Sequence, residues 1–417
     1  MIIGAALAKV IIPLLLILLF LPVLIWMERK GSAFIQDRHG PNRASIKGIR
    51  MGGMFHALAD VFKLLFKEDI TPNHVHKFYY YLAPAVAVTI ACITFIVIPF
   101  AAPIPTETGF FTFQSADLNI GILYILAMSS LGVYGAMLAG WSSNNKFALL
   151  GGLRSSAQMV SYELCMGLTV LSVILTAGSL TLNDIVTVQT SSVWQWNAIR
   201  DPLACIIFII AAFAETNRAP FDLPEGESEL VAGYHVEYSS MKFAMFYMAE
   251  YIHMFIASAL IVTLFFGGWQ IPFVSTDTLR ANAGQITYYA ALALGLFSIL
   301  VGALLSIRFK KGKYGDKRDY EVLVFGVPAV AFGLIIFLAA LFFGKTPLAL
   351  ETSLWVGAVI QILTFILKIL FMCWVFIWVR WTVPRIRYDQ LMNLGWKFLL
   401  PLAMVNIAAR AVWMVFK

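Results

Sequence analysis

Charged residues are scarce in this chain of 417 residues: 13% are charged, 60% are hydrophobic, and the mean hydropathy is +0.82. A soluble globular domain carries about a quarter charged residues, so that class is excluded.

Cysteine is rare as well. The four cysteines (Cys92, Cys165, Cys205 and Cys373) all lie in apolar runs without C-x-x-C spacing. This pattern predicts small core side chains and indicates neither disulfides nor a metal cluster.

Two kinds of ligand-binding motif are also missing. The six histidines form no ligand pair of the H-E-x-x-H type, and no glycine-rich phosphate loop occurs. We therefore expect this chain by itself to bind no metal, nucleotide, flavin or iron–sulfur cluster.

Long apolar runs are what the sequence has in abundance, and each is continuous rather than alternating, which favours helices over a membrane barrel. They predict an all-α polytopic transmembrane protein, with residues 1–417 forming a single integral membrane domain. The ten expected spans, of which the fifth is the shortest, are 3–26, 78–100, 120–140, 158–178, 199–214, 243–267, 286–307, 322–343, 353–378 and 396–414.

The basic residues lie mostly on one side of these spans. Alternate threading places five connections on one face, and these hold 23 of the 30 lysines and arginines. By the positive-inside rule that face is cytoplasmic or matrix, and the net charge of +7 reflects topology rather than nucleic-acid binding. The first span has its basic cluster after it, so we expect an uncleaved anchor with its N-terminus outside. The five connections are 27–77, 141–157, 215–242, 308–321 and 379–397.

Three carboxylates lie where charge is expensive, since a central acid costs roughly 2.5–3.5 kcal/mol on insertion scales. Glu163 and Glu250 lie inside expected spans, and Glu215 closes another. An intramembrane acid is by default a functional group; the alternative is a glutamate hydrogen-bonded to a neighbouring helix. Three acids entering from the inner side predict a proton path that rises to about mid-membrane and is continued by another protein.

The inner loop 215–242 is the most acidic segment. Six carboxylates occur within it, and three of them (Glu225, Glu227 and Glu229) alternate, so an extended segment would place these three on one face. Crowding and burial raise carboxylate pKa values, which allows proton exchange near neutral pH. Apolar residues interleave with the acids. We therefore expect this loop to be folded or docked on a partner.

The first inner loop, 27–77, contains an amphipathic stretch at 54–67. Met54, Leu58 and Val61 recur at helical spacing, and the segment is too short to span a bilayer. The pattern predicts an interfacial helix in the plane of the membrane, able to flank an opening for a lipid-soluble substrate. The alternative is a helix packed on neighbouring spans.

Several segments, in chain order, carry a family resemblance over about residues 1–268 and 350–417. They are Glu28-Arg29-Lys30, Gly40-Pro41-Asn42, Ala59-Asp60 with Lys63, Ser161-Tyr162-Glu163, Ala214-Glu215-Thr216-Asn217-Arg218-Ala219-Pro220-Phe221-Asp222, Glu225-Gly226-Glu227-Ser228-Glu229-Leu230, Glu237-Tyr238 and Pro384-Arg385-Ile386-Arg387-Tyr388-Asp389-Gln390-Leu391-Met392. With them the chain resembles one membrane subunit of respiratory complex I, which is the H-type subunit in bacteria and subunit one in mitochondria.

The resemblance implies a subunit of a proton-translocating NADH:quinone oxidoreductase with quinone as substrate. Implied partners are the peripheral-arm subunits that carry the iron–sulfur clusters, the adjacent small and antiporter-like membrane subunits, and lipid. The implied quinone-chamber and entrance residues are Arg29, Arg38, Met54, Phe55, Arg218, Phe221 and Asp222, with Asp60 on this path too. The implied relay is Glu28, Asp60, Glu163, Glu215, Glu225, Glu227, Glu229 and Glu250, with Arg380, Arg385 and Arg387 as counter-charges.

Two departures and two rival functions remain open. Residues 270–350 add two spans to the expected family core, and His235 stands where we expect Asn. The extra spans favour a bacterial inner membrane over a mitochondrial one. The rivals are the related membrane subunit of a membrane-bound hydrogenase and a free-standing proton or cation transporter. A purely structural anchor leaves the intramembrane acids unexplained.

Overall fold

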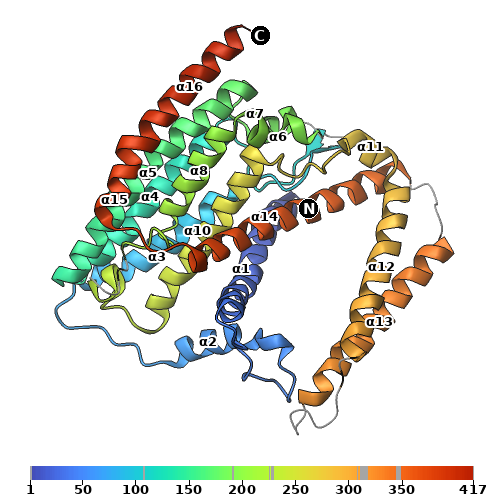
Figure 1. Ribbon diagram of the computed structural model, residues 1–417, viewed down its shortest axis with the longest axis horizontal. Coiled ribbons are helices and arrows are strands. Elements are labelled where there is room, and N and C mark those ends of the chain that lie inside the picture. Colours follow the sequence, from blue (N-terminus) through green and yellow to red (C-terminus); the bar gives the residue numbers. More distant parts are fainter. Residues whose placement is uncertain are drawn as a thin grey trace.

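The computed structural model describes residues 2–106, 109–189, 192–224, 226, 230–307, 309, 318–343 and 349–416, and these form a helical bundle with one small hairpin (Figure 1). The helices are α1 (Ile2–Ile35), α2 (Phe55–Phe66), α3 (Lys77–Thr94), α4 (Gly121–Ser142), α5 (Lys146–Ala177), α6 (Leu182–Val188), α7 (Asn197–Arg200), α8 (Pro202–Glu215), α10 (Ser240–Phe265), α11 (Thr276–Ala281), α12 (Ala283–Ile307), α13 (Arg318–Phe343), α14 (Leu350–Thr382), α15 (Tyr388–Asn393) and α16 (Leu400–Val415). The strands β1 (Ile104–Thr106) and β2 (Gly109–Phe111) pair antiparallel.

Nine helices of the described chain are long and apolar enough to cross a membrane, which confirms the all-α polytopic class. The remaining expected span is α8, which has 14 residues. At 1.5 Å per residue it is about 21 Å long, shorter than a hydrocarbon core of about 30 Å. Asp201 caps its N-terminus by accepting a hydrogen bond from Ala204 N at 3.1 Å, and the helix ends at Glu215.

Helix α5 begins twelve residues before the predicted start at 158. The prediction followed the apolar run, whereas the helix extends to Lys146 because the Asn145 side chain caps it, accepting from Phe147 N at 3.0 Å. Gly151 and Gly152 in the added turns let the backbone of other segments approach closely. As a result Glu163 lies near the middle of α5 and not close to its inner end.

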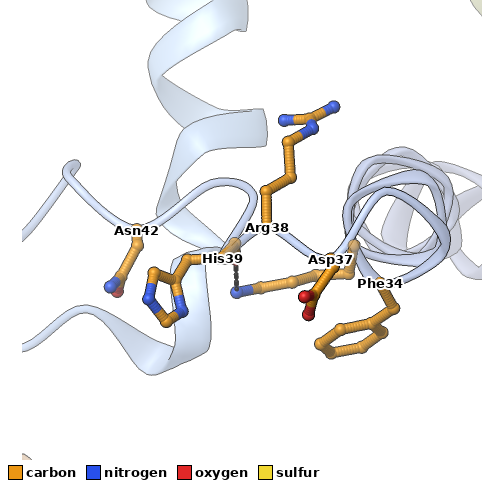
Figure 2. Close-up of a pocket in the computed structure, with 6 residues that line it drawn as sticks. Phe34, Asp37, Arg38, His39 and Asn42 are labelled. Atoms are coloured by element: carbon orange, nitrogen blue, oxygen red, sulfur yellow. Dashed lines mark hydrogen bonds between the residues drawn. The ribbon is translucent and has the colours of Figure 1, made fainter.

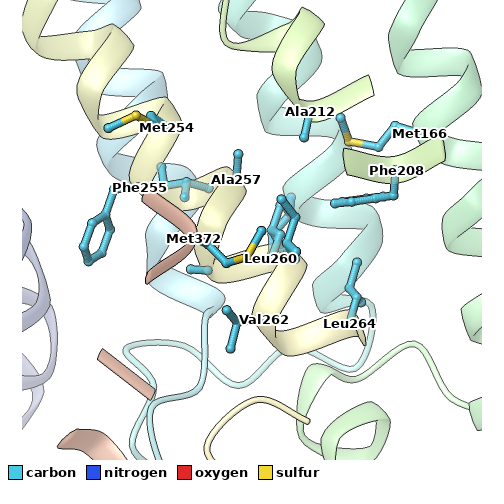
Figure 3. Packing of buried hydrophobic residues seen from close by; sticks show 14 of the residues in the cluster. Met166, Phe208, Ala212, Met254, Phe255, Ala257, Leu260, Val262, Leu264 and Met372 are labelled. Carbon is cyan, nitrogen blue, oxygen red and sulfur yellow. The ribbon is translucent and has the colours of Figure 1, made fainter. Parts of the chain in front are cut away.

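Helix α10 lies at the centre of the packing: 83% of its most apolar window is buried, against 11% for α12 and for α13. Figure 3 shows Leu260 of α10 on the side toward Phe208 of α8, near Met372 of α14, whereas Phe255 points to the opposite side. There its ring stacks on that of Phe20 of α1, with ring centres 5.8 Å apart. This continuous buried cluster fixes the positions of the polar groups on α8 and α10.

Helices α12 and α13 form a peripheral antiparallel hairpin at the edge of the bundle (Figure 1). Gly302 lies against Gly326, and Gly295 lies against Gly333. A Cβ at Gly302 would approach the Gly326 carbonyl oxygen to 2.7 Å, so the two backbones are in direct contact. This hairpin comprises the two extra spans predicted within 270–350.

The first inner loop contains the expected amphipathic helix. Helix α2 lies beside the lower end of α1 in Figure 1. Only Ala57 of this helix is buried, while Phe62 and Phe66 are 59% and 86% exposed. An apolar face is therefore left open on this helix, as an interfacial position requires.

Candidate functional site

A buried ionic cluster joins α1, α10, α14 and the loop after α8, which are far apart in the sequence. It consists of Glu28, Arg218, Tyr251 and Arg380, and we call it the charge clamp. The Glu28 carboxylate accepts hydrogen bonds from Arg218 Nη1 at 2.8 Å, Tyr251 Oη at 2.9 Å and Arg380 Nη1 at 2.5 Å. Glu28 is 7% exposed and Arg218 2%. Two guanidinium groups thus surround one carboxylate inside the bundle, and this carboxylate is fully paired.

Arg218 is the central cation of the charge clamp. Its guanidinium also lies 4.1 Å from the centre of the Tyr251 ring. Burial disfavours the charge on Arg218, but Glu28, Tyr251 and Glu250 outweigh that cost and raise the pKa of Arg218. Arg218 therefore stays charged at every physiological pH, and it connects the charge clamp electrostatically with Glu250.

A second polar region, the acid cavity, has a volume of about 40 Å³ and lies between α3, α4, α5, α10 and the end of α8. This volume is enough for ordered water, which needs roughly 10–15 Å³ per molecule. Tyr234 donates a hydrogen bond to Glu250 at 3.2 Å. Two of the three intramembrane acids singled out from the sequence, Glu215 and Glu250, line this cavity. Its lining residues are Ala87, Gly132, Ala136, Met159, Glu215, Thr216, Asn217, Tyr234, Phe246, Ala249, Glu250 and His253.

Glu163 is the third intramembrane acid and is partly buried beside the acid cavity. Its carboxylate accepts a hydrogen bond from Ser130 of α4. Glu163 and Ser129 both act electrostatically on Glu215. Glu163 also borders a groove of about 470 Å³ that is otherwise lined by aliphatic residues of α4, α5 and α16. The three acids are thus neighbours, and none is isolated by dry aliphatic packing.

Gln158, which the sequence analysis missed, fixes the end of α8 next to these acids. Its side-chain amide donates to the backbone carbonyls of Ala214 at 2.7 Å and Phe221 at 2.8 Å, and to Asn217 Oδ1 at 3.2 Å. One buried amide therefore sets where Glu215 leaves the helix and where the acidic loop turns back.

The acidic loop is folded in its described part. Asp222 is 4% exposed and pairs with Arg385 Nη2 at 2.7 Å. Phe221 is buried with its ring centre 5.9 Å from that of Tyr162, and Ile386 N donates to Pro220 O at 3.2 Å. The loop thus packs on the connection after α14. Glu225, Glu227 and Glu229 lie outside the described residues.

The three expected counter-charges separate into different settings. Arg380 belongs to the charge clamp and Arg385 pairs with Asp222. Within the residues that the structure describes, the one carboxylate that Arg387 pairs with is Asp389, two residues along the chain, at 3.2 Å and in an exposed position. The structure therefore brings two of the three to acids of the site and leaves the third on the surface.

Three of the expected entrance residues, Arg29, Met54 and Phe55, lie near the C-terminal end of α1. Arg29 pairs with Asp60 of α2 at 2.5 Å, with side chains 47% and 38% exposed. Met54 and Phe55, at the start of α2, are partly buried. Arg29 follows Glu28 directly, so α1 links this region with the charge clamp.

An open pocket of about 280 Å³ follows α1 and includes Arg38 (Figure 2). Lys30 Nζ donates to the His39 carbonyl at 2.9 Å and holds the loop closed. In Figure 2 the Arg38 side chain points away from Phe34 and Asn42, and its Nε donates to Gln36 Oε1 at 2.6 Å. Arg38 therefore lies on the surface of the molecule and is separate from the charge clamp.

His235 is 6% exposed and surrounded by aromatic rings, including that of Tyr234 with ring centres 5.2 Å apart. Burial lowers the pKa of His235 to about 4. It is therefore neutral near pH 7 and lies outside the lining of the acid cavity.

Comparison with known proteins assigns the family. A family model described as NADH dehydrogenase matches residues 8–314 and 319–411. The H-type subunit of the Salinibacter ruber NADH-quinone oxidoreductase is 44% identical over 400 residues, covering 95% of this chain and 92% of the relative. Subunit 8 of the Rhodothermus marinus enzyme is 43% identical, covering 94% of this chain and 91% of the relative. An H-type subunit of the Solibacter usitatus enzyme is 44% identical, covering 92% and 89%.

The match extends over most of the 270–350 segment as well, so it is wider than the range over which the motifs carry the resemblance. With nine apolar helices of spanning length in the described part, the chain is a multi-pass membrane protein. It belongs to the NADH dehydrogenase family of membrane subunits, as an H-type component of an NADH-quinone oxidoreductase complex.

Proposed function

We propose that this subunit forms the membrane side of the quinone-binding chamber and couples quinone reduction to proton translocation through an acidic relay. The observation that carries the proposal is the convergence of Glu215 and Glu250 on one cavity, beside Glu163 and next to the charge clamp. The related proteins are named as quinone oxidoreductases, which supports quinone as the substrate.

The chamber is proposed to lie at the inner end of α1, where α2 presents its apolar side chains and Arg29 and Arg38 supply positive charge. A quinone has a polar headgroup and an isoprenoid tail, so it needs an apolar approach that ends at polar donors. Residues Arg218, Phe221 and Asp222 form the inner wall in this proposal. Peripheral-arm subunits with iron–sulfur clusters would cover the chamber and deliver electrons.

Coupling is proposed to act by charge. Reduction of a quinone changes the charge at the chamber until protons are taken up. A unit charge about 10 Å from a carboxylate alters its energy by roughly 1.7 kcal/mol at an effective dielectric constant of 20. That is enough to change a proton equilibrium more than tenfold. Arg218 contacts Glu28 and acts on Glu250, so it links the chamber to the acid cavity.

Within this proposal Glu28 has a different role from the other acids. Its carboxylate is paired with two arginines and a tyrosine, whereas Glu163, Glu215 and Glu250 have hydroxyl neighbours. Glu215 and Glu250 also line the acid cavity, and Glu163 borders the groove beside it. The geometry favours Glu28 as a fixed charge that transmits the field and the other three as proton carriers. Asp60 would join the relay to the entrance through Arg29.

The relay is proposed to continue into adjacent small and antiporter-like membrane subunits at the groove beside Glu163. Glu225, Glu227 and Glu229 would extend it toward the inner surface. The assembly is placed in a bacterial inner membrane with the N-terminus of this chain on the periplasmic side, on the basis of its basic inner loops.

The test is the double substitution Glu163→Gln with Glu215→Gln in the assembled enzyme. Proton translocation should fall strongly, while NADH oxidation by a water-soluble acceptor stays normal, because glutamine keeps the volume but cannot release a proton. Glu351→Gln, an exposed acid in the first turn of α14, is the matched control and should leave translocation unchanged. Normal translocation in the double variant would contradict the relay.

A further inference from the structure

One titratable side chain of the acid cavity has no role in the function proposed above. His253 lies on α10 three residues after Glu250 and lines the same cavity as Glu215 and Glu250. Residues three apart on a helix lie on one face, so the placement follows from the geometry of α10. The imidazole edge faces α4: a Cβ at Gly132 would lie 3.6 Å from His253 Cε1 and 3.7 Å from Nε2.

The surroundings of His253 contain few other groups that exchange protons. Glu215 comes from the end of α8, Glu250 from α10 itself and Tyr234 from the 3₁₀ turn Gly233–His235. The lining residues from α3, α4 and α5 are Ala87, Gly132, Ala136 and Met159, none of which is titratable or charged. No hydrogen bond joins the imidazole to another residue in the described part of the chain.

Helix α4 connects the position of His253 with two of the three intramembrane acids. The same helix carries Ser130, which bonds Glu163, and Ser129, which acts on Glu215. The imidazole of His253 reaches α4 at Gly132, a short distance along the helix. His253 therefore lies close to Glu215 and Glu250 in the cavity, and also close to α4, the helix that contacts Glu163.

We propose that His253 is a proton-exchange group between Glu215 and Glu250. A proton passes from the carboxyl group of one glutamate to one ring nitrogen, while the proton on the other ring nitrogen passes to the carboxylate of the second glutamate. The imidazole is neutral before and after, and one negative charge has moved between the two acids. Ordered water in the cavity can bridge either transfer, and rotation or tautomer exchange of the ring restores the starting state.

An imidazole suits this task better than a further carboxylate. Its two nitrogens lie on opposite sides of the ring, so one accepts while the other donates. A carboxylate pair without such a bridge requires direct contact or a fixed chain of water molecules. The inference rests on the proposed function, because it presumes that Glu215 and Glu250 carry protons.

The test uses His253→Gln, His253→Asn and His253→Ala in the assembled enzyme, with His76→Gln as the control. His76 is exposed and stacks on Trp141 outside the cavity. Protons translocated per electron and quinone reduction are measured across pH 6–8, with and without added imidazole. We expect the three His253 variants to lose most proton translocation, the alanine variant to recover it with imidazole, and the control to behave as the native enzyme.

Three results would overturn the inference. One is normal proton translocation in His253→Gln. A second is a loss in all three variants with no recovery by imidazole, which assigns His253 a packing role only. If the variants fail to assemble, infrared difference spectra of the native enzyme containing ring-¹⁵N histidine are recorded during quinone reduction. A histidine band supports the inference, and the absence of any histidine band contradicts it.

The result is separable from that of the proposed function. If Glu163→Gln with Glu215→Gln abolishes translocation and His253→Gln does not, the relay stands and the inference about His253 fails. If the glutamate variant translocates normally, the relay itself fails.

Discussion

The stability of the bundle should depend strongly on the charge of Glu28. Glutamine at this position keeps the size of the side chain but removes its charge. Its NH₂ group would also replace one of the two oxygens that accept hydrogen bonds from the arginines, so that two donors would face each other. Arg218, which is 2% exposed, would then be a buried cation that has lost the carboxylate it hydrogen-bonds. Removing one member of a buried ion pair costs about 3–5 kcal/mol. We therefore expect Glu28→Gln to lower the free energy of unfolding by about that amount.

A surface pair one residue away supplies the matched control. Arg29 and Asp60 lie 2.5 Å apart, closer than Arg218 and Glu28 at 2.8 Å, but their side chains are 47% and 38% exposed. Exposed pairs contribute about 0–1 kcal/mol because water screens both charges. Asp60→Asn should therefore cost about 1 kcal/mol or less. The comparison separates burial from distance as the cause.

The measurement is unfolding of the purified full-length chain in mixed micelles by increasing sodium dodecyl sulfate, followed by tryptophan fluorescence. The double variant Glu28→Gln with Arg218→Gln should lose less stability than the two single variants added together, because the buried guanidinium of Arg218 is no longer left without its partner. Arg380 also loses the Glu28 carboxylate, but its side chain is 26% exposed and reaches solvent. Equal costs for Glu28→Gln and Asp60→Asn would refute the reasoning, and so would strict additivity in the double variant.

Two further predictions use the same unfolding assay. Burial lowers the pKa of His235 from 6.5 to about 4. Between these two pH values the unfolded chain therefore binds a proton that the folded chain does not bind. The free energy of unfolding should fall by about 3 kcal/mol as the pH falls from above 6.5 to 4. His235→Asn should remove this part of the pH dependence, and an unchanged slope would contradict the assignment. Gly302→Ala should destabilise the α12–α13 hairpin by about 1–3 kcal/mol, because a Cβ there meets the Gly326 carbonyl. Gly167→Ala, a helical glycine with nothing within 4 Å, should be neutral or stabilising by about 0.5–1 kcal/mol, and equal effects at both sites would contradict the packing argument.

Much of the candidate site was accessible from sequence because charge in a membrane span is conspicuous. Glu163, Glu215 and Glu250 were found in this way, and helical spacing located α2. His253 carried a usable signal that was overlooked: it follows an intramembrane acid at i+3 and so shares its face. Tyr251 follows Glu250 directly, about 100° further round the helix, and for that reason points to the charge clamp and not to the cavity.

Pairings between distant elements carried no such signal. Glu28 and Arg218 are 190 residues apart, and Glu28 and Arg380 are 352 apart. Hydrophobic periodicity says which face of a helix is buried but not which helix covers that face. The role of Gln158 as the residue that fixes the end of α8 was invisible for the same reason, since a single buried amide has no pattern.

The amino-acid sequence by itself determined that this chain crosses a membrane many times, where its basic loops lie and which acids are costly to bury, because transfer from water to hydrocarbon acts on each residue locally. The tertiary structure alone decided that Glu28 is held by two arginines, that Glu215, Glu250 and His253 share one cavity, and that Arg387 lies apart from the acids of the site. Those outcomes depend on how helices pack against one another, and packing is a property of pairs of surfaces rather than of any one segment.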